Sequence, residues 1–150
     1  MFIGYIQTRF PLCKNKAIQK YTPEGRAEIH DNLGINTKFM LKLMRQPMYG
    51  RSAQYADNRI SLYCAQLGKC AITGEPFSNT SETHCHHILP KDNGGGDEYQ
   101  NLVLVCETVH ILIHAKNTET IANYLGELSL NKWQINKLNK FREVAGNAKI

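Results

Sequence analysis

The sequence predicts an α+β fold in which several helices accompany one small two-stranded ribbon. Helix start signals occur repeatedly, beginning with Thr22 and Ser52, each at the head of a segment that can form a helix. Two short stretches over 83–89 and 102–106 have the texture of strands and are separated by a glycine-rich loop. A membrane-spanning fold is not expected, because no apolar run approaches the ~20 residues that cross a bilayer.

The first half of the chain is expected to be helical after an irregular arm over 1–21, which contains turn residues and scattered Lys and Arg. A Thr N-cap followed by Pro and Glu predicts a helix over 22–34, which ends at a glycine. A second helix is expected over 37–46, with its apolar residues on one face. A third should run from Ser52 to about residue 67.

The composition changes at Gly68, where a stretch with the Gly and Pro of a tight turn begins. We therefore expect a helical region over 22–67 and a second domain over 68–150. The elements expected in the second domain are strands over 83–89 and 102–106, and helices over 108–115, 118–128 and 131–145.

Positive charge is concentrated in the first part of the chain. Residues 1–60 contain ten Lys and Arg against four Asp and Glu, whereas residues 61–150 contain eight against nine. This asymmetry suggests that one part binds a polyanion while the other performs chemistry on it. A solvated basic surface without a partner is the alternative explanation.

The five cysteines are odd in number and irregularly spaced, which argues against a secreted disulfide framework. The N-terminus lacks the basic start, apolar core and cleavage site of a signal peptide. We therefore expect a reducing compartment: the cytoplasm, in association with the nucleoid, or an organelle if the source is eukaryotic.

A group of histidines carries the chemistry. His86 and His87 are adjacent on the first predicted strand, and His110 and His114 are spaced to share one helix face. Three imidazoles can hold one divalent ion with coordination positions left open, while a fourth acts as a base. Imidazoles suit Zn²⁺ or Ni²⁺, but Mg²⁺ or Mn²⁺ is expected in function. His84 is expected to lie outside this site.

The stretch from His84 to His114 resembles the HNH endonuclease motif, in which a His-His ribbon, a glycine-rich loop, an Asn and a His-x3-His helix follow one another. The resemblance implies a ββα-metal fold that hydrolyses phosphodiesters. It assigns the metal to His86, His110 and His114 and the general base to His87. It also implies that Asn101 hydrogen-bonds across the glycines at 94–96 and orients His87.

The resemblance extends upstream to the C-terminal part of group II intron-encoded proteins, through residues 3–8, 21–26, 50–52, 57–63 and 68–75. In that family a reverse transcriptase and maturase region precedes a DNA-binding region and an HNH domain. The implied activity is a nick in the bottom strand of a DNA target, whose 3′ end primes reverse transcription. The implied partners are double-stranded DNA, intron RNA and a reverse transcriptase/maturase polypeptide, with no membrane. The cations expected to contact phosphates are Arg26, Lys38, Lys42, Arg45, Arg51 and Arg59.

One feature departs from that family, many of whose members carry two Cys-x-x-Cys pairs that bind a structural zinc ion. The equivalent stretches here begin with Cys70 and Cys106 but have Thr73 and Val109 at their last positions. Two thiolates remain where four are required, and recruitment of Cys85 would give only three. We therefore expect no structural zinc, with Cys70 and Cys106 packed as small apolar residues.

Two other functions are compatible with the same residues. The first is a nucleic-acid-binding module without cleavage activity, whose histidines hold a structural zinc ion completed by His87 or Cys85. The glycine-rich loop with Asn101 argues against it, because a structural zinc site needs neither. The second is a toxin-like nonspecific nuclease with the same metal site, which the basic upstream region disfavours.

Overall fold

The computed structural model describes residues 21–32 and 34–150, so the expected arm over 1–21 lies almost entirely outside the described residues. The chain divides into two compact units, residues 1–33 and residues 34–150. In the first unit, helix α1 (Pro23–Asn32) begins where the sequence predicts. The Thr22 hydroxyl accepts a hydrogen bond from the Gly25 amide at 3.1 Å, which confirms the predicted N-cap.

The second unit begins with two helices, α2 (Thr37–Arg45) and α3 (Ala53–Ala65), both close to the predicted ranges. Ser52 caps α3 as predicted, because its side chain accepts from the Tyr55 amide. Asn36 caps α2 in the same manner, accepting from Phe39. The apolar face of α2 buries Phe39 and Leu43, which pack in the core of the unit.

The ribbon consists of β1 (Thr83–His87) and β2 (Leu102–Cys106), paired antiparallel so that His86 lies opposite Val103. The predicted first strand was two residues too long. The Asn101 side chain binds both the amide and the carbonyl of Leu89, which takes Leu89 out of the ladder. The loop between the strands contains two short 3₁₀ turns, η1 (Lys91–Asn93) and η2 (Tyr99–Asn101).

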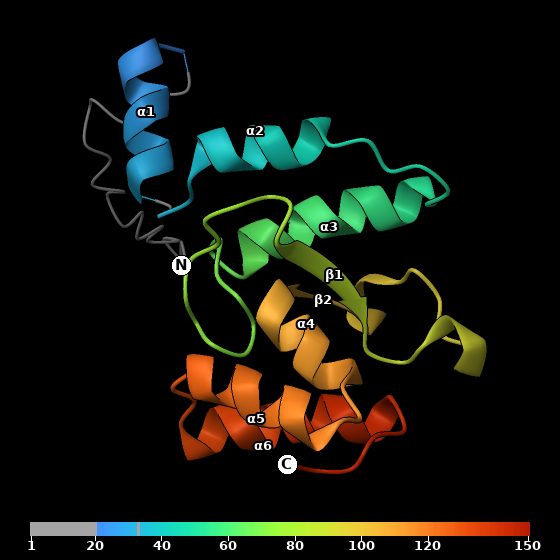
Figure 1. The fold of residues 1–150 in the computed structure, drawn as a ribbon. Coiled ribbons are helices and arrows are strands. Elements are labelled where there is room, and N and C mark those ends of the chain that lie inside the picture. Colours follow the sequence, from blue (N-terminus) through green and yellow to red (C-terminus); the bar gives the residue numbers. More distant parts are fainter. Residues whose placement is uncertain (1–20, 33) are drawn as a thin grey trace, which may run out of the picture. The chain divides into compact units, whose positions relative to one another are not determined.

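Three helices complete the unit: α4 (Glu107–His114), α5 (Thr118–Glu127) and α6 (Lys132–Val144). Asn131 caps α6 as predicted and forms a capping box with Gln134. Helix α4 contacts both strands of the ribbon and also α5 and α6, while α3 contacts β2 (Figure 1). The ribbon therefore packs between helices, and the α+β prediction is confirmed.

The core of the second unit is formed by apolar side chains from the ribbon and the helices around it. Leu104, Val109, Leu112 and Leu138 are completely buried, and Tyr63 of α3 packs in the same cluster. The domain boundary predicted near residue 68 stays a prediction. No helix of the described residues is long and apolar enough to span a membrane.

Candidate metal centre and active site

Three histidines from two elements meet beside the ribbon. His86 lies in β1, and His110 and His114 are one helical turn apart in α4, so they share one face of the helix. One nitrogen of each ring lies within 4.8 Å of the others. The ring centres are separated by 4.9, 5.1 and 5.5 Å. The structure therefore brings together the three residues that the sequence predicts as metal ligands.

Burial keeps these three imidazoles neutral. Burial, assisted by His114 and His110, lowers the pKa of His86 to about 3. Burial and the neighbouring His84 lower the pKa of His110 to about 4. Burial also lowers the pKa of His114. At neutral pH each ring therefore offers a lone pair rather than a positive charge.

The cluster fits a divalent metal ion. His86 is only 3% exposed, and its Nε2 has no hydrogen-bond partner among the residues that the structure describes. A buried polar atom without a partner is costly, and a bound cation would satisfy it. Three nitrogen donors leave positions for water and substrate, which is the pattern of catalytic rather than structural sites.

The end of α4 that carries the metal ligands is fixed by the C-terminal segment. The Arg142 guanidinium is buried and donates to the carbonyl oxygens of Leu112 and Ala115. The Asn147 amide donates to the carbonyl oxygen of Ile113 at 2.8 Å. The last carbonyls of a helix have no partner within the helix, so these bonds satisfy them and hold the ligands in place.

His87 follows His86 but lies on the opposite face of the strand. The three-histidine cluster does not include it. Its Nε2 is 2.7 Å from Oδ1 of Asp97, in the loop between the strands. Its ring is stacked on Tyr55 of α3, with 5.5 Å between the ring centres. His87 is therefore held from two sides, on the face of the strand opposite to that of His86.

Asp97 is the centre of a small polar network. The Ser52 hydroxyl donates to its Oδ2 at 2.6 Å, Lys91 lies 3.0 Å from its Oδ1, and Asn58 donates to its main-chain carbonyl. Hydrogen bonds from Ser52, His87 and Lys91 hold the pKa of Asp97 well below its usual range. The ionised carboxylate can only accept, so the proton shared with His87 sits on Nε2. Nδ1 of neutral His87 therefore has a free lone pair.

Asn101 spans the glycine loop between the strands. Its side chain accepts from the Leu89 amide at 2.8 Å and donates to the carbonyl oxygens of Leu89, at 3.1 Å, and Gly96, at 2.9 Å. Asn101 therefore hydrogen-bonds across the glycine loop, as predicted. The side chain that hydrogen-bonds His87 directly is that of Asp97, and the orienting role of Asn101 stays a prediction.

Sequence reasoning missed two residues of this region. Asp97 directly follows the glycines of the loop. A carboxylate at this position is the sequence signal for a partner of the second nitrogen of His87. His84 lies two residues before His86 and therefore on the same face of the strand. Its ring stacks on His110, with centres 4.7 Å apart and planes inclined by 7°. His84 contacts the cluster without belonging to the three clustered ligands.

The predicted phosphate contacts fall into three groups. Four of the six cations are exposed: Lys38, Lys42, Arg45 and Arg51. Arg59 is a correction, because it is only 4% exposed and donates to the Leu43 carbonyl and, at 2.9 Å, to the Gln46 side chain. Its guanidinium joins α3 to α2 and does not face solvent. The Arg26 side chain lies outside the described part of the structure.

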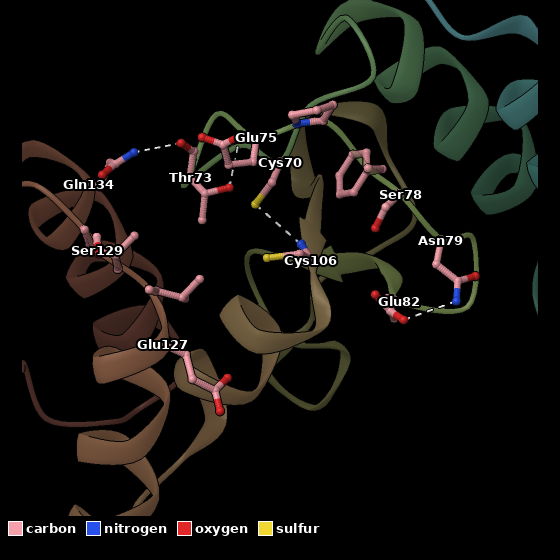
Figure 2. Close-up of a pocket in the computed structure, with 14 residues that line it drawn as sticks. Cys70, Thr73, Glu75, Ser78, Asn79, Glu82, Cys106, Glu127, Ser129 and Gln134 are labelled. Carbon is pink, nitrogen blue, oxygen red and sulfur yellow. Dashed lines mark hydrogen bonds between the residues drawn. The ribbon is translucent and has the colours of Figure 1, made fainter.

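Cys70 and Cys106 lie together at one wall of a pocket (Figure 2). The Cys106 amide donates to Sγ of Cys70 at 3.4 Å, and Cys70 is buried. Hydrogen bonds from Cys106 and Thr73 lower the pKa of the Cys70 thiol, although burial opposes the shift. Thr73 and Val109 occupy the other two positions, and neither offers a thiolate.

Comparison with known proteins bears on the same segment. The family model described as HNH endonuclease matches residues 69–116, which include the ribbon, α4 and Asn101. Comparisons with curated proteins and with solved structures found no match. The matched segment contains all three clustered histidines and His87, which supports nuclease activity. The chain therefore contains an HNH endonuclease domain at residues 69–116.

Proposed function

We propose that this protein is a metal-dependent DNA endonuclease that nicks one strand of a double-stranded target by phosphodiester hydrolysis. One observation carries the proposal. A three-histidine cluster with neutral rings includes His86, and the next residue of the same strand is an imidazole whose Nε2 is bound by a carboxylate. The HNH endonuclease match over residues 69–116 supports the same reaction class.

His86, His110 and His114 would hold one divalent ion, Mg²⁺ or Mn²⁺ in function, while Zn²⁺ or Ni²⁺ can occupy the same donors. When bound, the ion would stabilise negative charge on the phosphate and on the leaving oxygen. His87 would act as the general base, because its Nδ1 can take a proton from the attacking water. Asp97 would stabilise the resulting imidazolium through the bond to Nε2.

The loop and α3 act as positioning elements in this reaction. Asn101 fixes the loop backbone at Gly96, the residue before Asp97. Ser52 and Asn58, at the start and in the first half of α3, bind the Asp97 side chain and main chain. The orientation of His87 therefore depends on α3 as well as on the ribbon. A base held within tenths of an ångström is what general-base catalysis requires.

We further propose that the nick serves group II intron mobility, with intron RNA and a reverse transcriptase/maturase polypeptide as partners, in the cytoplasm or an organelle. The resemblance of residues 21–26, 50–52 and 57–63 to group II intron-encoded proteins supports this context. Mapping nicks on plasmid DNA by primer extension tests it. Cleavage that needs the partner and occurs at one site on one strand supports the proposal, and random nicking on both strands contradicts it.

Nicking of supercoiled plasmid by the purified chain tests the endonuclease activity. The reaction is run with EDTA, Mg²⁺, Mn²⁺, Ni²⁺ or Zn²⁺, beside the His87→Ala variant. We expect metal-dependent conversion to open circles, lowered about 10²- to 10⁴-fold in the variant, which should still bind metal. Wild-type protein that is inert with every ion, or a variant as active as wild type, contradicts the proposal.

The same samples separate the proposal from a nucleic-acid-binding module with structural zinc. A structural zinc site contributes folding energy, so chelation would unfold such a module. For the nuclease we expect chelation to abolish nicking while the circular dichroism spectrum is retained. Unfolding on chelation, together with DNA binding that never leads to cleavage, would favour the binding module.

A further inference from the structure

A groove of about 410 Å³ lies between the segment that joins α2 to α3 and the first strand of the ribbon. His84 and His110 are among its lining residues, and Tyr49 and Arg51 line it from the connecting segment. Its lining includes two histidines, two tyrosines and two arginines, of which Arg59 is already paired within the protein, and it contains no carboxylate. The groove is therefore suited to a negatively charged ligand.

Arg51 is placed to bind such a ligand. Its side chain is exposed, and its guanidinium lies over the Tyr55 ring, 4.9 Å from the ring centre. The hydrogen bonds among residues 21–32 and 34–150 include none donated by this guanidinium, so its donors face solvent. The Tyr55 ring restricts the guanidinium without neutralising it, which leaves a positioned fork of donors that matches a phosphate.

Tyr49 adds an apolar surface to the same groove. It is 90% exposed, whereas soluble proteins tend to bury at least part of so large a ring. The residue is two positions from Arg51, so the aromatic and the cationic groups are offered together. This combination suits a nucleotide, whose sugar packs on a ring while its phosphate binds a guanidinium.

The groove is continuous with the metal centre through two stacked rings. His84 and His110 both line it, and His110 is also one of the three clustered ligands. A strand that places its phosphate at the histidine cluster can therefore continue into the groove. An acidic peptide could match the charge, but it would give no reason for this continuity with a nuclease site.

We propose that this groove holds the nucleotide next to the scissile phosphate of the DNA strand, with Arg51 on its phosphate and Tyr49 packed on its sugar. The proposal rests on the proposed function, because it assumes that the histidine cluster acts on DNA. It assigns Tyr49 to substrate binding and assigns Arg51 to the phosphate of this one nucleotide. It also leaves Lys38, Lys42 and Arg45 as contacts further along the duplex.

Binding without catalysis tests the groove separately from cleavage. Fluorescence anisotropy is measured with the full chain and a labelled 20-base-pair duplex in EDTA, over a series of salt concentrations. For Arg51→Ala we expect weaker binding and a slope of log K against log salt that is shallower by about 0.9. For Tyr49→Ala we expect about fivefold or greater weakening with an unchanged slope, and Tyr49→Phe should restore affinity.

Matched controls come from α6, away from the groove. Lys140→Ala removes an exposed cation, and Trp133→Ala removes a ring that is 66% exposed. Neither should change affinity beyond twofold. Unchanged DNA affinity in Tyr49→Ala and Arg51→Ala overturns the proposal. An equal or larger loss of affinity in the α6 variants overturns it too. Failure of the wild type to bind the duplex overturns it as well.

Cleavage kinetics then distinguish this proposal from the endonuclease assignment. For an active enzyme we expect Tyr49→Ala and Arg51→Ala to raise KM severalfold with kcat little changed. Nicking with an unchanged KM in both variants refutes the groove while the nuclease stands. If the wild type never nicks DNA but its binding depends on Tyr49 and Arg51, the groove is a DNA-binding site and the endonuclease proposal is refuted. Thermal unfolding of each variant shows whether the fold is retained.

Discussion

Two hollows of similar size are each lined in part by residues of the ribbon, and their linings have opposite charge. The groove beside His110 has a volume of about 410 Å³ and contains arginines but no carboxylate. The pocket beside Cys106 has a volume of about 390 Å³ and is lined by Glu75, Glu82 and Glu127, with no Lys or Arg (Figure 2). Polyanionic DNA would be attracted to the first and repelled by the second. Charge therefore distinguishes the two, whereas volume does not.

The two regions also differ in what they can do with a metal. Both lie along α4, which has Cys106 as its N-cap and carries His110 and His114 further on. The histidines form a three-ligand group, while the cysteines lack the third and fourth donors. Among the described residues, the three-ligand group therefore lies at the histidine end of α4 and does not include the cysteines.

Helix α6 is hydrogen-bonded to the turn that follows Cys70. The Gln134 amide donates to the Thr73 carbonyl at 2.8 Å, and the Lys137 ammonium donates to the Ala71 carbonyl at 2.6 Å. The turn also pairs with the ribbon, since the Ala71 amide donates to the Leu104 carbonyl. Protein hydrogen bonds therefore hold this turn both to α6 and to the ribbon.

The largest expected effect comes from removing one metal ligand. His110→Ala should lower affinity for Mn²⁺ or Zn²⁺ at least a hundredfold, because only two of the three imidazole ligands remain. Cys106→Ala is the matched change at the other end of the comparison and should leave metal affinity unchanged. Isothermal titration calorimetry measures both. A reversed ranking, with metal lost in Cys106→Ala, would show that the cysteine region is the working site.

A smaller effect is expected from the carboxylate behind His87. Asp97→Asn removes the charge that stabilises the imidazolium and allows the amide to favour the other tautomer. We expect the nicking rate at saturating Mn²⁺ to fall about ten- to a hundredfold, with metal affinity retained. Equal rates in the variant and wild type would mean that the carboxylate has no part in activating the base.

The next largest effect is expected at Gly95, where the geometry of the ribbon loop leaves no room for a side chain. A Cβ there would lie 1.9 Å from the Leu89 carbonyl oxygen, so the loop would have to shift. We expect Gly95→Ala to lower the free energy of unfolding by about 1–3 kcal/mol. Gly126→Ala is the control, because it is helical with open space and should stabilise by about 0.5–1 kcal/mol. Urea denaturation of both variants measures this, and equal values would contradict the loop geometry.

The smallest effect concerns the turn beside the cysteines. Lys137→Met keeps most of the side-chain stem but removes the donor to the Ala71 carbonyl. We expect a loss of about 1 kcal/mol in the free energy of unfolding, without a change in metal affinity. Lys140→Met, on an exposed position of the same helix, should cost nothing measurable. Urea midpoints that do not differ would show that the bond from Lys137 does not stabilise this turn.

Local signals predicted much of this structure. Thr22, Ser52 and Asn131 act as N-caps as expected, because capping depends on residues within one helical turn. The clustering of His110 and His114 follows from helical periodicity alone. Features that depend on tertiary contacts escaped prediction. Arg59 is buried against the α2 carbonyls, and the Asp97 carboxylate reaches His87 only once the loop has folded.

The proposed function requires that the histidine cluster, and not the cysteine pair, holds the metal ion of the nuclease. The most direct test titrates Mn²⁺ into metal-free protein and follows bound metal and plasmid nicking together in wild type, His110→Ala and Cys106→Ala. We predict that nicking rises with occupancy of one ion per chain in wild type and Cys106→Ala, and that both are lost in His110→Ala. Nicking that persists in His110→Ala at unchanged metal occupancy would contradict the account.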